Sequence, residues 1–235
     1  MFTASRQVDI VVYCGGKCGS TTLETTFNKN GFHAIRAHGI HEWNLRFPRG
    51  PDIISIIKEN RNKVYIIDAY RTPIERKISS FFHNITQHVP FYEYISITNL
   101  IAIFNNHFLS QLEEYHPIDE VMQVFNVPQF TEFDFTRGYV IKEHNNMVFI
   151  KLLFRDIATW ETILSSIFGR DITLHPDNIT SSMNIYTAFK AAYRVPATYL
   201  TQLQNDSHFH IFNTPEEQKE YIAKWALKVD TAQGM

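Results

Sequence analysis

A short glycine-rich segment carries the clearest chemical signal in the sequence. It runs from Gly15 to Thr22 and reads Gly-Gly-Lys-Cys-Gly-Ser-Thr-Thr. Glycines let several backbone N–H groups point toward one anion, and Lys17 adds a positive charge. The hydroxyl groups of Ser20, Thr21 and Thr22 are further donors. This combination predicts a site for a phosphate or sulfate group.

The order of residues in this segment differs from that of an ATP-binding Walker A loop. In that pattern the lysine follows the last glycine, whereas Lys17 precedes Gly19 here. The alternative interpretation is a glycine-rich turn between a strand and a helix, with a lysine that is merely exposed to solvent. We expect the anion to be bound by Gly16, Lys17, Cys18, Gly19, Ser20, Thr21 and Thr22.

A second group of polar residues follows the apolar run at residues 63–70. Arg71 comes directly after that run, and Ser79 lies eight residues further on. If a helix begins near Pro73, Ser79 is about two turns into it. A guanidinium fork and a hydroxyl can hold one phosphate together. The alternative is an arginine that closes a strand and a serine that is buried on a helix.

Together the two segments resemble the motifs of sulfotransferases that use 3′-phosphoadenosine-5′-phosphosulfate (PAPS). The first is similar to the K-S-G-T-T form of the loop that binds the 5′-phosphosulfate. The second matches R-D-P-S-E-R-V-L-S, a heparan-sulfate-type motif for the 3′-phosphate, at Arg71, Pro73, Glu75, Arg76 and Ser79. Thr72 departs from the usual Asp or Asn. The resemblance covers residues 8–85, and polysaccharide-type members, including a capsular polysaccharide synthesis group, are the most similar.

This resemblance implies transfer of a sulfuryl group from PAPS to a hydroxyl group, with a carbohydrate or polysaccharide as the acceptor. The product would be 3′,5′-bisphosphoadenosine, and no metal is required. Lys17 would stabilise the leaving group. The family places its general base near the end of the second strand, where the candidates are His38, His41 and Glu42. Each of these three is equally well explained as a loop residue without a chemical role.

Two arginines follow the candidate bases. Arg46 and Arg49 are interpreted as contacts to an anionic acceptor, and the alternative is that they are simply solvated. Two other functions remain open. One is a nucleotide-dependent kinase with an altered phosphate loop, in which Asp68 would bind Mg²⁺. The other is a non-catalytic nucleotide-binding protein of the same fold.

The elements that must position these residues alternate along the chain. Strand-like runs at 8–14, 33–38 and 63–70 alternate with helical segments at 20–30, 51–60 and 73–85. This order predicts a parallel sheet, in an α/β P-loop-like three-layer sandwich with a mostly parallel central sheet flanked by helices. Further strands are expected at 139–144, 147–154 and 208–212, and a loop at 39–50. We expect one sulfotransferase-like domain, residues 1–235.

Composition limits the classes of partner. The chain has 235 residues, a formal net charge of −2 and 44% hydrophobic residues, which is typical of a globular protein. This charge balance gives no general attraction to nucleic acid. Two cysteines are too few for a disulfide framework or a zinc cluster. With no apolar stretch of about 18 residues, we expect no integral membrane segment and a cytoplasmic location if the chain is full length.

Overall fold

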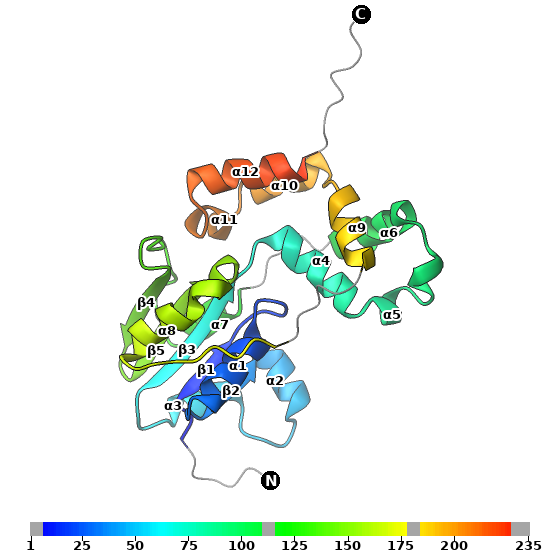
Figure 1. Cartoon of the computed structure of the whole chain (residues 1–235). Coiled ribbons are helices and arrows are strands. Elements are labelled where there is room, and N and C mark those ends of the chain that lie inside the picture. The colour runs from blue at the N-terminus through cyan, green and yellow to red at the C-terminus, as the bar shows by residue number, and fades with distance from the viewer. Residues whose placement is uncertain (1–6, 110–115, 178–183, 227–235) are drawn as a thin grey trace, which may run out of the picture. The chain divides into compact units, whose positions relative to one another are not determined.

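The computed structural model describes residues 7–109, 116–177 and 184–226. The chain forms two compact units (Figure 1). The first unit comprises Met1–Arg76 and Glu114–Ile179, and the second comprises Lys77–Glu113 and Thr180–Met235. The first unit contains the glycine-rich segment and Arg71.

A five-stranded sheet in the order β2-β1-β3-β5-β4 forms the centre of the first unit. The strands are β1 (Ile10–Tyr13), β2 (Ala34–Ala37), β3 (Val64–Tyr70), β4 (Tyr139–His144) and β5 (Met147–Leu153). β2, β1, β3 and β5 are parallel neighbours, and β4 pairs with β5 in the antiparallel direction. Every residue of β1 and β5 is buried, as expected for strands that are covered on both faces. The prediction of a mostly parallel central sheet in an α/β fold is confirmed.

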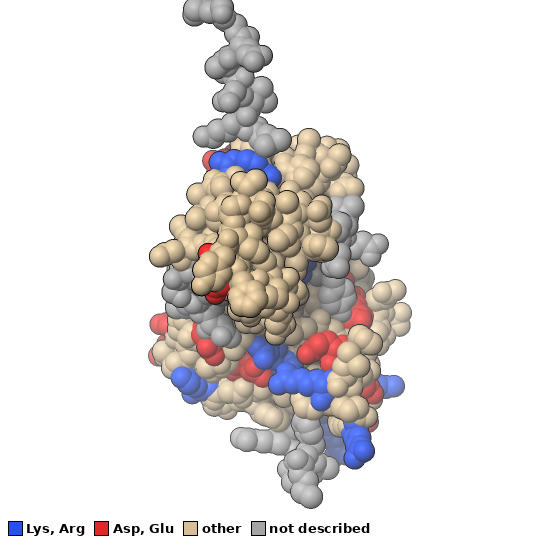
Figure 2. Space-filling view, turned by 90° about the vertical axis from the view of Figure 1, so that its right-hand side faces the viewer, with Lys and Arg blue, Asp and Glu red and all other residues tan. Residues whose placement is uncertain are grey.

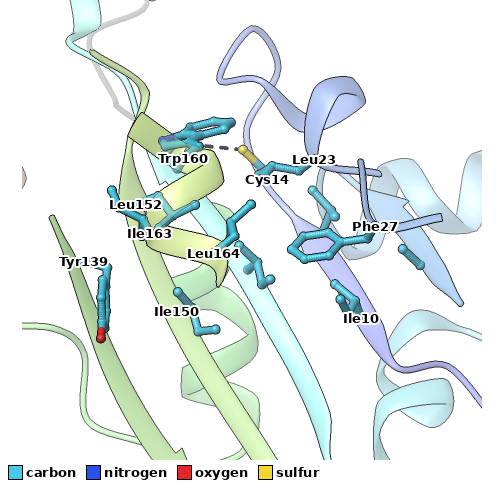
Figure 3. Close-up of a cluster of buried hydrophobic side chains, with 14 of the residues drawn as sticks. Ile10, Cys14, Leu23, Phe27, Tyr139, Ile150, Leu152, Trp160, Ile163 and Leu164 are labelled. Atoms are coloured by element: carbon cyan, nitrogen blue, oxygen red, sulfur yellow. Dashed lines mark hydrogen bonds between the residues drawn. The ribbon is translucent and has the colours of Figure 1, made fainter. Parts of the chain in front are cut away.

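Helices flank this sheet. They are α1 (Ser20–Lys29), α2 (Ile40–Arg46), α3 (Ile53–Lys58), α7 (Pro117–Val124) and α8 (Trp160–Phe168), with the 3-10 helix η3 (Phe154–Thr159) before α8. Figure 3 shows α1 and α8 sharing one apolar cluster with the strands, to which the two helices contribute Leu23, Phe27, Trp160, Ile163 and Leu164. Full burial of a side chain of this size stabilises the fold by about 1.5–3 kcal/mol. This cluster holds the start of α1 at a fixed place beside the sheet.

The second unit is helical. Helix α4 (Pro73–His83) runs into it from the first unit. It also contains α5 (Ile85–His88), the 3-10 helix η1 (Tyr92–Tyr94), α6 (Ile97–Phe104), the π-helix η2 (Asn105–Leu109), α9 (Asn184–Ala192), α10 (Ala197–Leu203), α11 (Ser207–Ile211) and α12 (Pro215–Trp225). Its core is aromatic, and it is built from Phe81, Phe82, Phe104, Phe189 and Tyr193.

Two sequence-based assignments are wrong. Residues 39–50 were expected to form a loop, but residues 40–46 form α2, because Trp43 is buried and its Nε1 donates to the carbonyl oxygen of Pro51 at 3.0 Å. Residues 208–212 were expected to form a strand, but α11 covers most of them. Asp206 caps that helix by accepting from the backbone N–H of Phe209 at 2.6 Å.

Candidate anion-binding site

The candidate site lies where neighbouring parallel strands end. The glycine-rich segment follows β1, His38 follows β2 and Arg71 follows β3. β1 pairs with both β2 and β3, so the three strand ends are side by side. In open α/β sheets ligands bind at this carboxyl edge.

The glycine-rich loop has a left-handed backbone at two of its residues. Gly19 is the N-cap residue of α1 with a φ of 86°, and Lys17 is also left-handed with a φ of 68°. Gly19 provides no side-chain cap, so the first N–H groups of α1 are available to a ligand. A Cβ at Gly19 would lie 2.8 Å from Cη2 of Trp160. Glycine at this position therefore permits both the left-handed turn and the close approach of α8.

Arg71 is in direct contact with this loop. Its Nη1 donates to the carbonyl oxygen of Lys17 at 2.7 Å. The guanidinium carbon also lies 4.4 Å from the centroid of the Phe154 ring, at the start of η3. Phe154 and the loop thus fix the orientation of Arg71. The two sequence motifs, 54 positions apart, meet at one end of the sheet.

Lys17 and Arg71 bring two positive charges close together. Across the described ranges 7–109, 116–177 and 184–226, neither Lys17 nor Arg71 forms an ion pair. Partial burial, and then the nearby charge of Arg71, lower the pKa of the Lys17 ammonium below its usual value. A bound anion would offset both the desolvation of the Lys17 ammonium and its repulsion by Arg71.

The acidic residue nearest to this strand end is already engaged. Asp68 on β3 accepts from Nζ of Lys151 on β5 at 2.5 Å, and both side chains are buried. The other oxygen of Asp68 accepts from the backbone N–H of Ala69 at 2.7 Å. A buried carboxylate neutralised in this way is poorly placed to coordinate Mg²⁺, because Lys151 would then lose its partner.

The three candidate bases differ in their contacts. Nδ1 of His38 lies 2.6 Å from the carbonyl oxygen of Cys14. A carbonyl can only accept, so Nδ1 carries the proton in this contact, and Nε2 of the neutral ring is left with its lone pair. Glu42 accepts from the backbone N–H of His38 at 3.3 Å, and His41 is exposed on α2. His38 is therefore the candidate that is fixed to the loop.

The hydroxyl groups at the start of α1 have partners within the protein. Thr21 Oγ1 accepts from Nη1 of Arg36. Thr22 Oγ1 donates to the backbone oxygen of Asp177 at 3.3 Å and accepts from its N–H at 3.2 Å. Thr21 Oγ1 acts only as an acceptor in this contact, so its O–H can still donate to an anion, whereas the Thr22 hydroxyl already donates to Asp177. Ser20 is buried at the first helical position.

The remaining predicted residues are less closely tied to the loop. Arg46 and Arg49 are both exposed, and the guanidinium carbon of Arg46 lies 5.2 Å from the Phe47 ring centroid. Ser79 is buried on α4 and belongs to the second unit. Its role in holding a 3′-phosphate stays a prediction.

Sequence reasoning missed Glu120 on α7. Its Oε2 accepts from the hydroxyl of Tyr13 at 2.6 Å and from the backbone N–H of Ile40 at 3.2 Å. Glu120 therefore links the end of β1 to the start of α2. No local pattern indicates this role, because Tyr13 and Glu120 are 107 positions apart.

No family model matches the chain, and the comparisons with curated proteins and with solved structures find no match either. None of the helices in the described residues combines the length and the apolar character that crossing a membrane requires. On the face drawn in Figure 2, basic and acidic side chains are interspersed.

Proposed function

We propose that the chain is a PAPS-dependent sulfotransferase with a P-loop-like nucleotide site, and that it acts on a hydroxyl group of a carbohydrate. The contact between Arg71 and the Lys17 carbonyl carries this proposal, because it joins the two motifs that resemble the donor site. The absence of carboxylate partners for Lys17 and Arg71 among the described residues supports an anionic ligand. The order of lysine and glycine in the loop supports PAPS over ATP.

The residues at the strand ends suit an in-line displacement. PAPS supplies a sulfuryl group on a phosphate leaving group. The N–H groups at the start of α1 would orient that phosphate, and Lys17 would stabilise negative charge on the bridging oxygen. His38 would accept the proton of the acceptor hydroxyl at Nε2, because its Nδ1 is held by Cys14. Glu120 would keep the turn that carries His38 in place.

The two other functions make different demands on the site. A kinase needs a carboxylate for Mg²⁺, and Asp68 is paired with Lys151. A non-catalytic nucleotide-binding protein would use the same loop but would not need a base beside it. A transfer assay with PAPS and glycans, phenols and tyrosine peptides separates this case, since only an enzyme produces a sulfated acceptor.

The donor assignment is tested by ligand-dependent stability. We expect 3′,5′-bisphosphoadenosine without metal to raise the melting temperature more than ATP with Mg²⁺, because a ligand stabilises the state that binds it. Lys17→Ala should reduce this shift. Lys29→Ala, an exposed change in the last turn of the same helix, should leave it intact. A larger shift with ATP and Mg²⁺ would instead favour the kinase.

A further inference from the structure

One of the two cysteines of the chain, Cys14, directly precedes the glycine-rich loop, and the other, Cys18, lies within it. Cys14 follows β1 and is fully buried, and Cys18 is 4% exposed. Cys14 Sγ lies 3.8 Å from the carbonyl oxygen of Cys18, and Cys18 Sγ lies 3.7 Å from that of Gly16. Figure 3 shows Cys14 facing the apolar cluster. The proposed transfer reaction uses neither thiol.

Cys18 also borders a small positively charged pocket in the first unit. A Cβ placed on Gly15 would be 3.8 Å from Cys18 Sγ and 3.2 Å from Nη1 of Arg76, so the thiol and this guanidinium are close to each other. The volume of the pocket open to the centre of a water molecule is about 10 Å³, which is enough for one very small molecule. Its wall also includes Asp68, Arg71, His116 and Lys151.

The environments of the two thiols differ in a way that suits sequential roles. A hydrogen bond from Cys14, together with the charges of Arg76 and Arg71, lowers the pKa of the Cys18 thiol in spite of its burial. Burial and the hydrogen bond to Cys18 raise the pKa of Cys14. Cys18 also lines the pocket, whereas Cys14 is fully buried, so a small oxidant in the pocket meets Cys18 first, and the neighbouring thiol can then resolve the oxidised sulfur.

We propose that Cys18 is a peroxide-reactive thiol and that Cys14 resolves it to a disulfide across the loop. The Cys18 thiolate attacks one oxygen of hydrogen peroxide, the O–O bond breaks, and hydroxide leaves and is protonated to water. The sulfur of Cys14 then attacks the sulfur of the Cys18 sulfenic acid. The S–O bond breaks, and water leaves with the Cys14 proton. Two thiols lose two electrons, and the peroxide is reduced to two water molecules.

The consequence for ligand binding rests on the proposed function. A disulfide fixes its two Cβ atoms within about 4.5 Å of each other, and forming it replaces the contacts that the two sulfurs make with the carbonyl oxygens of Cys18 and Gly16. Lys17 lies inside the bridged segment and Gly19 directly beyond it. The N–H groups of the loop therefore shift. We expect affinity for 3′,5′-bisphosphoadenosine to fall about tenfold, as for loss of roughly one hydrogen bond to a charged group.

Peptide mapping of the intact chain tests the oxidation. The reduced protein is treated with about one equivalent of hydrogen peroxide, blocked with N-ethylmaleimide and digested with trypsin. Cleavage after Lys17 separates the cysteines onto the peptides 7–17 and 18–29. We expect these two peptides to be joined by a disulfide in monomeric protein. Full alkylation of both thiols, or a disulfide only between two chains, would overturn the proposal.

Single cysteine variants test the order of the two steps. In Cys14→Ser, the sulfenic acid on Cys18 should persist and be trapped by dimedone. In Cys18→Ser, Cys14 should stay reduced. Cys14→Ala replaces Cys14→Ser if the serine in the core prevents folding. Dimedone on Cys14 in the Cys18→Ser variant would show that the roles are reversed and would refute the assignment.

Binding measurements separate this inference from the proposed function. If reduced and oxidised protein bind 3′,5′-bisphosphoadenosine equally, the disulfide does not change the affinity of the loop, and its proposed effect on binding is refuted. If the reduced protein does not bind 3′,5′-bisphosphoadenosine, the proposed function fails, and so does the proposed effect of the disulfide on binding. The linked peptides still decide whether Cys14 and Cys18 are the oxidation site. Dithiothreitol should restore binding to the oxidised wild-type protein.

Discussion

At the scale of single residues, the site depends on two cations held close together. The contact of Arg71 with the backbone of Lys17 places a second positive charge beside an ammonium that is already partly desolvated. Such an arrangement costs free energy in the unliganded protein. It becomes favourable when an anion binds between the donors. The same feature predicts how binding responds to pH.

Binding of 3′,5′-bisphosphoadenosine should weaken as pH rises toward the usual Lys17 pKa of 10.5. The pKa of Lys17 is lowered in the free protein, so the ammonium begins to lose its proton below that pH, and a bound anion raises the pKa again. Binding should therefore take up protons in this window. Calorimetry in two buffers of different ionisation enthalpy measures the uptake.

Lys17→Arg is the matched control for this measurement, because a guanidinium keeps its charge throughout the window. Its binding should lose the pH dependence. An unchanged pH profile in Lys17→Arg would assign the titration to another group. The lowered pKa of Lys17 also affects folding stability. Between that lowered pKa and 10.5, the usual value that the unfolded chain keeps, the unfolded chain binds more protons than the folded protein does. The contribution of Lys17 to the free energy of unfolding therefore rises with pH in this window.

The sequence predicted the placement of Arg71 because its signal is local and topological. A residue directly after a buried strand emerges at the sheet edge, and parallel neighbours share that edge. The partners of Thr22 and Tyr13 were not predictable in this way. Asp177 and Glu120 reach these residues from 155 and 107 positions away, and such contacts follow from packing rather than from a local pattern.

At the scale of elements, the junction between the loop and α1 depends on the packing of α8. The Trp160 ring lies over Gly19, and its Nε1 donates to the carbonyl oxygen of Leu153 at 3.0 Å. Trp160 is fully buried. The ring therefore has little freedom to move away from a larger residue at position 19.

Gly19→Ala should lower the free energy of unfolding by at least about 1–2 kcal/mol, the cost of a left-handed backbone for a residue with a Cβ. The contact with Trp160 adds to this cost. Gly16→Ala is the control for stability, since nothing lies within 4 Å of its Cβ position. Urea unfolding measures both variants. Equal stability of Gly19→Ala and wild type would contradict the packing argument.

Strands and long helices were predicted more successfully than short helices. Strand β1 is a continuous apolar run, and β3 and β5 are apolar apart from Asp68 and Lys151, so their type follows from the sequence itself. Helices α2 and α11 have seven and five residues, and isolated helices of this length are unstable in water. Burial of Trp43 and Phe209 stabilises them, and burial depends on the rest of the fold.

At the scale of the whole molecule, the chain passes between its two units more than once. Residues 77–113 and 180–235 belong to the second unit, and the segment between them belongs to the first. Sequence analysis treated the chain as one domain because no linker composition marks these crossings. The boundary between the units falls within α4, so that Arg76 belongs to the first unit and Ser79 to the second.

Hydrogen exchange can test whether Ser79 takes part in binding the nucleotide. If Ser79 holds a 3′-phosphate, 3′,5′-bisphosphoadenosine should protect amides of the glycine-rich loop and of α4. Adenosine 5′-phosphosulfate lacks that phosphate and should protect the loop alone. The amides of α12 serve as an internal reference for the second unit. Equal protection of α4 by both ligands would refute the role of Ser79.

Strand β4 bears on whether copies of this protein associate through the edge of the sheet at high concentration. It is the outermost strand of the sheet and bonds only to β5 among the strands. Nζ of Lys142 donates to the carbonyl oxygens of Pro128 and Gln129 at 3.0 and 2.5 Å, and exposed Glu143 adds a second charge. Charged side chains on an outer strand oppose the addition of a strand from another molecule. We therefore expect β4 to be a poor template for the addition of a strand from another molecule.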